Sequence, residues 1–261
     1  MMKYLESNNL ITDRQYGYRQ KRSTNIATTL LLDSIKKEVD KGLLVGATFI
    51  DLSKAFNTIS HARILDKLPS YGISGRELDW MSSYLFSRHQ FVQIDNFTSN
   101  LQPCLNGVPQ GSMLGPLLFL IFFNDFTETL QKSDAVIYAD DADVIFCAGK
   151  NVTSIEKDLT EDMAEIKTYF DDNELVINMN VGKTEVMLFG TAKRISMQPR
   201  PLKVFYNQQQ INNTNCYTYL RHTIEGTLNL NSDFELSYKR VATRLKLLSK
   251  LRGYLNQDAA L

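Results

Sequence analysis

The sequence predicts an α+β fold in which helices alternate with antiparallel hairpins. One observation is a pair of short apolar runs, 135–139 and 142–148, separated only by Asp140 and Asp141, as in a tight β-hairpin. A second is a helix with one apolar face, marked by residues that recur at helical spacing: Ile155, Leu159, Met163, Ile166 and Phe170.

The first half of the chain supplies further elements in order. Residues 24–41 read as a helix, with Ser23 or Thr24 as its cap and Gly42 just past its end. Residues 43–51 form a nearly continuous apolar run that ends in a carboxylate, which predicts a central buried strand. Ser74 and Glu77 have the spacing of a capping box, so a helix carrying Leu78, Met81 and Leu85 is expected after them.

The middle of the chain continues the alternation. Residues 91–94 and 101–105 are expected to pair as strands, and 107–111 form a turn-rich loop. Pro116 then opens an apolar helix at its first position, where proline is tolerated. Further strands are expected at 185–189, 204–206 and 217–224.

A last helix is predicted from Ser232, which forms a second capping box with Glu235. Its apolar stripe consists of Val241, Leu245, Leu248 and Leu255. The other faces carry six bases and no acid: Lys239, Arg240, Arg244, Lys246, Lys250 and Arg252.

Composition excludes several classes of protein. The 261 residues are 43% hydrophobic and carry no net charge, as in an ordinary globular protein. The longest apolar run, Leu117 to Phe123, is far shorter than the roughly 20 residues that span a bilayer. The start of the chain lacks the apolar core of a signal peptide, so an intracellular protein is expected. Neither the three cysteines nor the three histidines have the spacing of zinc ligands.

Charge is nevertheless segregated along the chain. Eight acids and two lysines lie between Glu156 and Glu174, while the bases gather in the last helix. Segregation of this kind suggests one surface that meets an anion and another that does not. The acidic block is expected to be solvated on the polar face of its helix, pointing away from any nucleic acid.

Carboxylates are expected to converge from separate strand ends. Asp51 closes one apolar run, and the pair Asp140 and Asp141 lies between two others. Hard oxygen ligands of this kind suit Mg²⁺, whose remaining positions substrate phosphates fill. Paired ions would activate an attacking oxygen and stabilise a leaving one.

Six collinear segments carry a resemblance to a known family: QYGYRQKRST (15–24), FIDLSKAFNTISH (49–61), YGISGRELDWMSSYLFSRHQFV (71–92), NGVPQGSMLGPLLFLIFFNDF (106–126), YADDADVI (138–145) and GKTEVMLFG (182–190). The chain resembles the reverse transcriptase domain of non-LTR retrotransposons, LINE-like and jockey-like. The resemblance implies a right-hand polymerase palm, an antiparallel sheet with helices on one face. Residues 1–230 would form fingers and palm, and 231–261 the start of a helical thumb. The family's first fingers motif and an endonuclease domain are absent from this chain, so the fingers are expected to be incomplete.

The same resemblance implies roles at the chemical centre. Asp51, Asp140 and Asp141 would be catalytic metal ligands for two Mg²⁺ ions, with Mn²⁺ as an alternative. Asp140 would bridge the ions, and Asp141, facing the other way along the strand, is the less direct ligand. Lys183 would protonate the departing pyrophosphate.

Further residues are implied to bind the incoming nucleotide. Arg19 and Arg22 would approach its triphosphate, because guanidinium geometry suits phosphate oxygens. Phe56 would block a ribose 2′-OH, and Gln110 and Gly111 would lie under the nucleotide.

The nucleic-acid contacts are implied near the end of the chain. Tyr219 lies in a segment resembling the primer grip, and Arg244, Lys246 and Lys250 would hold the template–primer backbone. Two positions depart from the family pattern. Asn57 stands where an aspartate is usual, and Arg221 stands where a glycine is usual, a position at which a side chain disturbs close backbone approach.

The sequence thus predicts an RNA-directed DNA polymerase that extends a DNA primer on an RNA template using dNTPs. Its alternative is a truncated, inactive remnant that folds and binds nucleic acid without polymerising. Other palm enzymes are disfavoured: Phe56 opposes an RNA-dependent RNA polymerase, and the VPQGS loop opposes a nucleotide cyclase.

Overall fold

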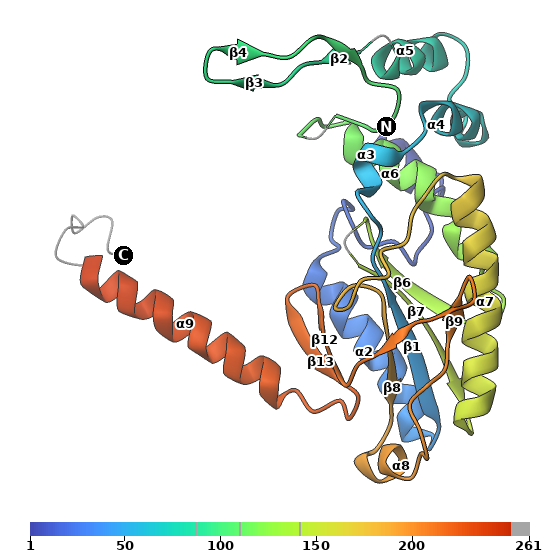
Figure 1. The fold of residues 1–261 in the computed structure, drawn as a ribbon, viewed down its shortest axis with the longest axis vertical. Coiled ribbons are helices and arrows are strands. Elements are labelled where there is room, and N and C mark those ends of the chain that lie inside the picture. Colours follow the sequence, from blue (N-terminus) through green and yellow to red (C-terminus); the bar gives the residue numbers. More distant parts are fainter. Residues whose placement is uncertain (87, 110, 141, 252–261) are drawn as a thin grey trace.

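A five-stranded sheet forms the centre of the computed structural model, in the strand order β11-β8-β1-β7-β6 (Figure 1). The structure describes residues 1–251 except 87, 110 and 141. The strands are β1 (Leu44–Ile50), β6 (Asp134–Tyr138), β7 (Ala142–Gly149), β8 (Glu185–Phe189) and β11 (Asn212–Asn213). All neighbours are antiparallel except β11, which runs parallel to β8 at the edge.

Both faces of the sheet are covered, and β1 is therefore buried at every one of its positions. On one face lie α6 (Gly115–Phe123) and α7 (Val152–Asp172), the expected helical layer. On the other face, α2 (Thr24–Asp40) packs together with the hairpin of β12 (Cys216–Tyr219) and β13 (His222–Glu225). The expectation of helices on one face therefore omitted α2, whose buried Leu31 and Ile35 contribute to the second layer.

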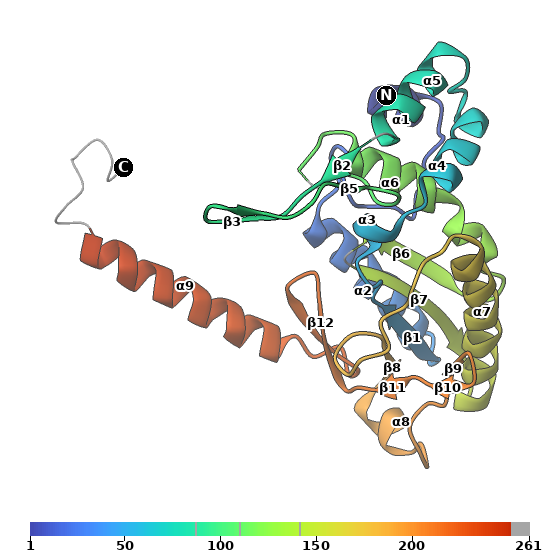
Figure 2. The ribbon, with the colours of Figure 1, turned by 45° about the horizontal axis from the view of Figure 1, so that its top comes forward.

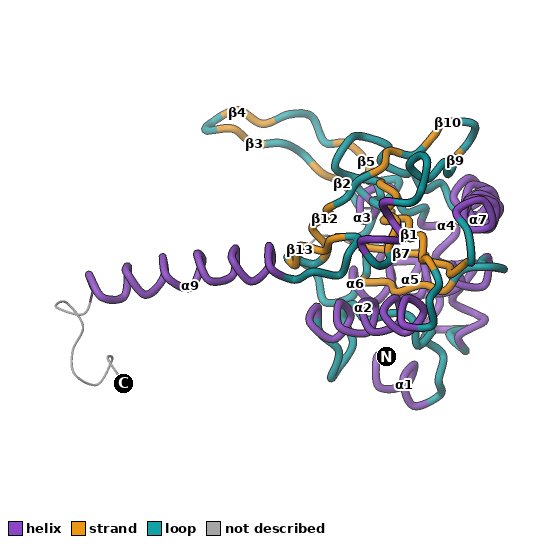
Figure 3. Tube along the Cα trace, turned by 90° about the horizontal axis from the view of Figure 1, so that it is seen from below, coloured by secondary structure: helices purple, strands orange, loops and turns teal. Residues whose placement is uncertain are grey.

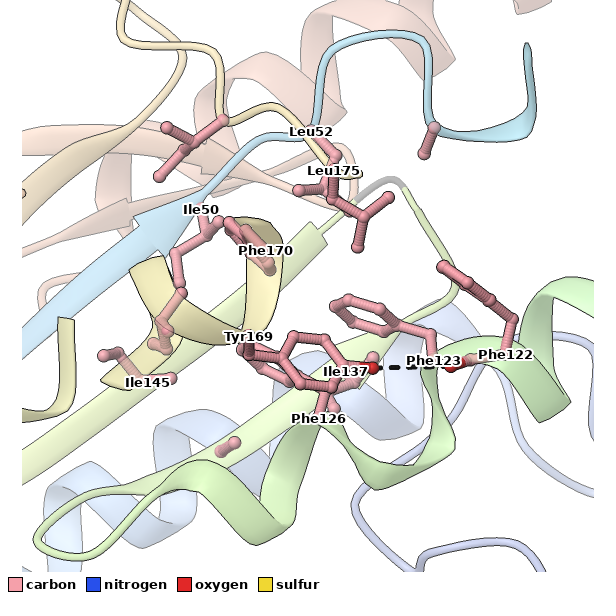
Figure 4. Close-up of a cluster of buried hydrophobic side chains, with 14 of the residues drawn as sticks. Ile50, Leu52, Phe122, Phe123, Phe126, Ile137, Ile145, Tyr169, Phe170 and Leu175 are labelled. Carbon is pink, nitrogen blue, oxygen red and sulfur yellow. Dashed lines mark hydrogen bonds between the residues drawn. The ribbon is translucent and has the colours of Figure 1, made fainter. Parts of the chain in front are cut away.

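Aromatic rings fill the core between the sheet and its first helical layer (Figure 4). Phe123 stacks on Phe126 with ring centroids 4.6 Å apart, and Phe126 stacks on Phe170 of α7 at 5.9 Å. The hydroxyl of Tyr169 donates to the main-chain oxygen of Phe122 and to Asp125. These contacts anchor α6 and the turn after it to α7.

Smaller elements surround this core. The helices are α1 (Met2–Ser7), α3 (Ala55–Thr58), α4 (His61–Lys67), η1 (Leu68–Tyr71), α5 (Arg76–Leu85), η2 (Asn124–Thr129) and α8 (Ala192–Ser196). Besides β12 and β13, three further strand pairs of the described residues lie outside the main sheet: β2 (His89–Gln90) with β5 (Gln102–Pro103), β3 (Gln93–Ile94) with β4 (Phe97–Thr98), and β9 (Phe205–Tyr206) with β10 (Gln209–Gln210). No helix in the described ranges is long and apolar enough to cross a membrane.

Two arms project from the same side of the body. One is the β3–β4 hairpin, and the other is α9 (Asn231–Leu251), which contacts β13 near its start and then leaves the domain (Figures 2 and 3). The predicted apolar stripe of α9 is exposed at Val241, Leu245 and Leu248, since no described element lies along that part of the helix. Leu255 falls outside the described residues.

The local predictions have mixed outcomes. The hydroxyl of Ser23 accepts from the amide of Ile26, which confirms the cap of α2. The first capping box is wrong: Gly75, with φ 57°, precedes α5, and no side chain caps it. The second capping box depends on the side chain of Ser232, which lies outside the described part of the structure; α9 itself begins at Asn231, one residue before the expected cap.

Two strand predictions also change. The pairing of residues 91–94 with 101–105 is replaced by the short β2–β5 and β3–β4 ladders. The strand expected at 217–224 is two strands joined by a turn, in which Leu220 and Arg221 both have positive φ angles.

The acidic block of α7 is not wholly solvated, which corrects the expectation for Glu156 and Asp162. Both side chains are buried because each has partners outside the helix. Glu156 accepts from the guanidinium of Arg200 and from the amide of Lys203. Asp162 accepts from the three consecutive amides of residues 131–133.

Candidate active site

Asp51 and Asp140 lie at the same end of the central sheet. Asp51 follows Ile50, whose partner across the β1–β7 ladder is Asp143. On the other side of β7, Tyr138 pairs with Ala142, so Asp140 lies in the turn that joins β6 to β7. Neighbouring strands lie about 4.8 Å apart, so the register brings the two predicted carboxylates to one edge. Asp141 lies outside the described residues.

A lysine already neutralises Asp51. The Nζ atom of Lys183 is 3.2 Å from Oδ2 of Asp51, and the two side chains are 53% and 20% exposed. The predicted catalytic lysine is thus placed beside the predicted metal ligand. The carboxylate of Asp51 is reachable from solvent and already pairs with the ammonium group of Lys183. Such a carboxylate suits a divalent ion, which prefers hard oxygen donors. The described residues contain no cluster of three or more metal-ligating side chains.

Tyr217 holds the main chain of Lys183, a contact that no sequence pattern predicts. Its hydroxyl donates to the carbonyl oxygen of Lys183 over 2.8 Å, and its ring stacks on Phe49 with centroids 4.1 Å apart. Burial, with smaller contributions from the negative charges of Asp51 and Glu185, raises the pKa of Tyr217 to about 12. Tyr217 therefore stays a neutral donor around pH 7.

The main chain of Asp51 is held from the segment that precedes β8. Its amide donates to Oγ1 of Thr184 over 3.2 Å, and its carbonyl oxygen accepts from the amide of Asn178 over 2.8 Å. Leu52 and Ile177 then form an isolated antiparallel bridge. Thr184 is fully buried. In the sequence, only its position next to Lys183 in the GKTEVMLFG segment could have indicated this supporting role.

Phe56 lies in α3, a few residues after Asp51, on a platform of aromatic rings. Its ring is 5.0 Å from the buried ring of Phe119 and 6.5 Å from Tyr18. The main chain of the 107–108 loop is bonded to the same segment, with the amide of Val108 donating to the carbonyl oxygen of Phe56 over 2.9 Å. The ring is half-buried, so one part of it faces solvent and the rest packs against the core.

Gly107 allows this loop to approach α3 closely. Its φ angle is +82°, and a Cβ atom there would lie 2.8 Å from the carbonyl oxygen of Asn57. Its own carbonyl oxygen is 2.7 Å from Nε2 of His61. Farther along, Gly111 is exposed with φ +78° and open space around it, whereas Gln110 lies outside the described residues.

Arg19 and Arg22 are engaged within their own segment. Nη1 of Arg19 donates to the carbonyl oxygen of Thr12 over 2.8 Å, and its Nε contacts Glu6; the side chain is only 10% exposed. Arg22 pairs with Asp13 and covers the ring of Tyr16. In this conformation both guanidinium groups stabilise the segment that precedes α2, and a contact with a triphosphate remains a prediction.

The predicted nucleic-acid residues separate into two groups. Tyr219 is 1% exposed and packs beside Phe49, so its ring reaches no surface at which nucleic acid binds in this conformation. Arg244, Lys246 and Lys250 are exposed on α9, distant along the helix from its junction with β13. The structure therefore does not bring the basic residues of α9 to Asp51.

Comparisons with solved structures define the class of fold. The structure of apo telomerase from Candida tropicalis, truncated from its C-terminal domain, matches with a TM-score of 0.58 at 9% identity. The match covers 87% of this chain and 42% of that one. A second structure of apo telomerase from the same organism gives a TM-score of 0.57 at 8% identity. The architecture is thus the palm-type fold of a reverse transcriptase.

The chain belongs to the reverse transcriptase (RNA-dependent DNA polymerase) family, whose sequence profile matches residues 1–224. It is 26% identical over 268 residues to the probable RNA-directed DNA polymerase from transposon BS of Drosophila melanogaster. It is likewise 26% identical to the RNA-directed DNA polymerase from mobile element jockey of the same organism. These matches cover 97% and 93% of this chain but only 28% and 26% of the relatives, so the chain spans about a quarter of their length.

Proposed function

We propose that the protein acts as the RNA-directed DNA polymerase of a non-LTR retrotransposon, joining a primer 3′-OH to a dNTP with release of pyrophosphate. The observation that carries this proposal is the placement of Asp51, Asp140 and Lys183 at one end of a buried sheet. Family membership and the likeness to the BS and jockey polymerases support it.

Asp51, Asp140 and Asp141 would hold two divalent ions, Mg²⁺ or Mn²⁺. When bound, such ions activate the attacking hydroxyl and neutralise charge on the phosphate oxygens. The chain contributes the orientation of the ligands. Because β1 is buried along its whole length and Thr184 holds the amide of Asp51, the carboxylate starts from a fixed backbone.

Lys183 would exchange one anionic partner for another. Its ammonium group pairs with Asp51 in this structure, and Asp51 would hold a divalent ion in place of that ammonium group. The freed Nζ would then donate a proton to the departing pyrophosphate. Tyr217 supports this role, because its hydroxyl fixes the main chain of Lys183 while leaving the side chain free to turn.

Substrate selection would lie with the aromatic platform and the arms. The exposed part of the Phe56 ring would contact the sugar of the incoming nucleotide and exclude a 2′-OH. Gln110 and Gly111 would lie below that nucleotide, and Arg19 and Arg22 would reach its triphosphate after leaving their present partners. An RNA template paired to a DNA primer would bind along α9, the beginning of the thumb, through Arg244, Lys246 and Lys250. Tyr219 would support this surface from the core.

Primer extension on poly(rA)/oligo(dT) tests the proposal. Asp51→Asn and Asp140→Asn are expected to abolish incorporation while leaving circular dichroism unchanged, because an amide lacks the charge that paired cations require. Asp134→Asn is the matched control, since Asp134 is exposed at the opposite end of β6 and is expected to keep full activity. Near-normal extension by either site variant contradicts the assignment. Metal binding without extension by the unmodified chain favours the inactive remnant.

A further inference from the structure

A short segment of the fingers lies against the edge of the palm sheet beside the β6–β7 turn. Gln15 forms a parallel bridge with Ile137, in which the amide of Tyr16 donates to the carbonyl oxygen of Ile137 over 2.8 Å. The amide of Ile137 in turn donates to the carbonyl oxygen of Arg14 over 2.9 Å. The segment therefore extends β6 on the side away from β7.

The side chain of Gln15 reaches the turn that carries Asp140. Its Oε1 atom accepts from the amide of Gly17 over 2.7 Å and from the amide of Ala139 over 3.0 Å. Gln15 and Ala139 are both 2% exposed, so water does not reach the amide of Ala139. Oε1 of Gln15 supplies the hydrogen-bond acceptor that this buried amide requires.

Ala139 needs such support because its backbone is left-handed, with φ 57°. That conformation is unfavourable for a residue with a Cβ atom and persists only where its surroundings hold it. Asp140 is the next residue, so the direction of its carboxylate depends on the conformation that Ala139 adopts. Gln15 thus acts on the turn one residue before the predicted ligand.

Gly17 makes the contact possible. A Cβ atom at position 17 would lie 2.6 Å from the amide nitrogen of Ala139 and 2.7 Å from its Cβ atom. Any side chain here would push the segment away from the turn. From the other side, Nη1 atoms of Arg19 and Arg22 each donate to the main-chain oxygen of Gln15 over 3.3 Å. Both arginines therefore hold the main chain of the residue whose side chain supports Ala139.

We propose that Gln15 is a positioning residue for the metal site: its side-chain carbonyl fixes Ala139 in the left-handed conformation and thereby directs the carboxylate of Asp140 toward a divalent cation. This inference rests on the proposed function. Loss of partners that orient a metal ligand typically weakens metal binding 10- to 100-fold. Because Gln15 acts through the backbone of a neighbouring residue, a loss of about tenfold, at the lower end of that range, is expected.

Mn²⁺ binding, followed by electron paramagnetic resonance of the free ion, tests the inference without any need for catalysis. Gln15→Leu keeps the size of the side chain but removes the acceptor, and Gly17→Ala keeps the acceptor but forces it away. Both are expected to weaken Mn²⁺ binding about tenfold. Gln15→Glu retains an acceptor oxygen and is expected to bind at least as tightly as the unmodified protein.

Two controls separate the possible outcomes. Leu202→Ala opens the core beside Gly46, in the first half of β1, and is expected to reduce stability without changing the Mn²⁺ affinity. Asp140→Asn reports on the metal site itself. If Asp140→Asn leaves Mn²⁺ binding unchanged, the proposed function fails at its metal site. If Asp140→Asn abolishes binding but Gln15→Leu and Gly17→Ala bind like the unmodified protein, the positioning role is refuted while the metal site stands.

Discussion

Replacing Asp162 by alanine should be among the most damaging single changes on α7, although the residue lies within a block of surface-like acids. Its carboxylate accepts from the amides of Gln131, Lys132 and Ser133 at distances from 2.7 to 3.2 Å. Hydrogen bonds to a charged group contribute about 1.5–3 kcal/mol each, and their loss leaves donors unpaired. Water can reach the exposed residues 131 and 132, whereas Ser133 is buried. The expected loss is therefore about 3–5 kcal/mol of unfolding free energy rather than the full sum.

Urea denaturation followed by circular dichroism measures this loss as a lower midpoint at constant slope. Glu165→Ala on the same helix is the matched control, because Glu165 is exposed and is expected to change stability by less than about 0.5 kcal/mol. Asp162→Asn should fall between the two, since an amide oxygen accepts without the charge. If Asp162→Ala and Glu165→Ala unfold at the same urea midpoint, the hydrogen bonds from the amides of residues 131–133 to Asp162 do not stabilise the segment before β6.

The remaining predictions concern four other places. Arg221→Gly should raise the unfolding free energy by about 1 kcal/mol, because φ at this turn is 73° and only glycine adopts it freely; an unchanged urea midpoint would contradict this. Burial acts to raise the pKa of Glu156, but hydrogen bonds from Arg200 and Lys203 outweigh it and hold that pKa below its usual value. The resulting stability is present above about pH 4.3 and lost as pH falls through the lowered pKa, so Glu156→Gln should flatten the acid limb of Tm against pH; an equally steep limb would refute it. Phe56→Val should raise kcat/KM for UTP relative to dTTP by about 10- to 200-fold, whereas equal losses for both nucleotides would leave the ring as packing. Replacing Arg244 and Lys246 together by alanine should reduce the salt dependence of RNA–DNA duplex binding by up to about 0.9 in log K against log salt per lost phosphate contact; an unchanged slope would mean that α9 is a solvated surface.

Much of the central sheet could be predicted from the sequence because its signals are local. The apolar run before Asp51 predicts a strand buried on both faces, and β1 is buried at all its positions. The two short runs around Asp140 predict a hairpin, and the ladder from Tyr138 to Ala142 confirms it. The convergence of Asp51 and Asp140 depends in addition on the pairing of β1 with β7, which joins segments far apart in the sequence.

The supporting contacts could not be predicted, because each depends on a partner far along the chain. Oε1 of Gln15 meets an amide 124 positions away, and Asp162 meets amides about 30 positions away. In the sequence around them, Gln15 and Asp162 cannot be told apart from a glutamine or an aspartate that is exposed to solvent. The failed capping box before α5 shows that a local pattern can also mislead. Ser74 and Glu77 have the required spacing, but the positive φ of Gly75 directs the chain into α5 by another route.

The central sheet is packed on both faces, whereas the projecting arms make few contacts with the rest of the chain. Asp51, the 139–140 turn and Lys183 are held by strands packed on both faces. α9, in contrast, is attached through its first turns, where Asp233 accepts from the amide of Thr223 and lies 3.2 Å from Nδ1 of His222. Farther along the helix, Arg240 donates to the carbonyl oxygen of Arg221, and the exposed residues after it contribute little burial. Segments with few buried contacts open and move at the lowest free energy. We therefore expect duplex binding to change the direction of α9 while the sheet that carries the carboxylates keeps its geometry.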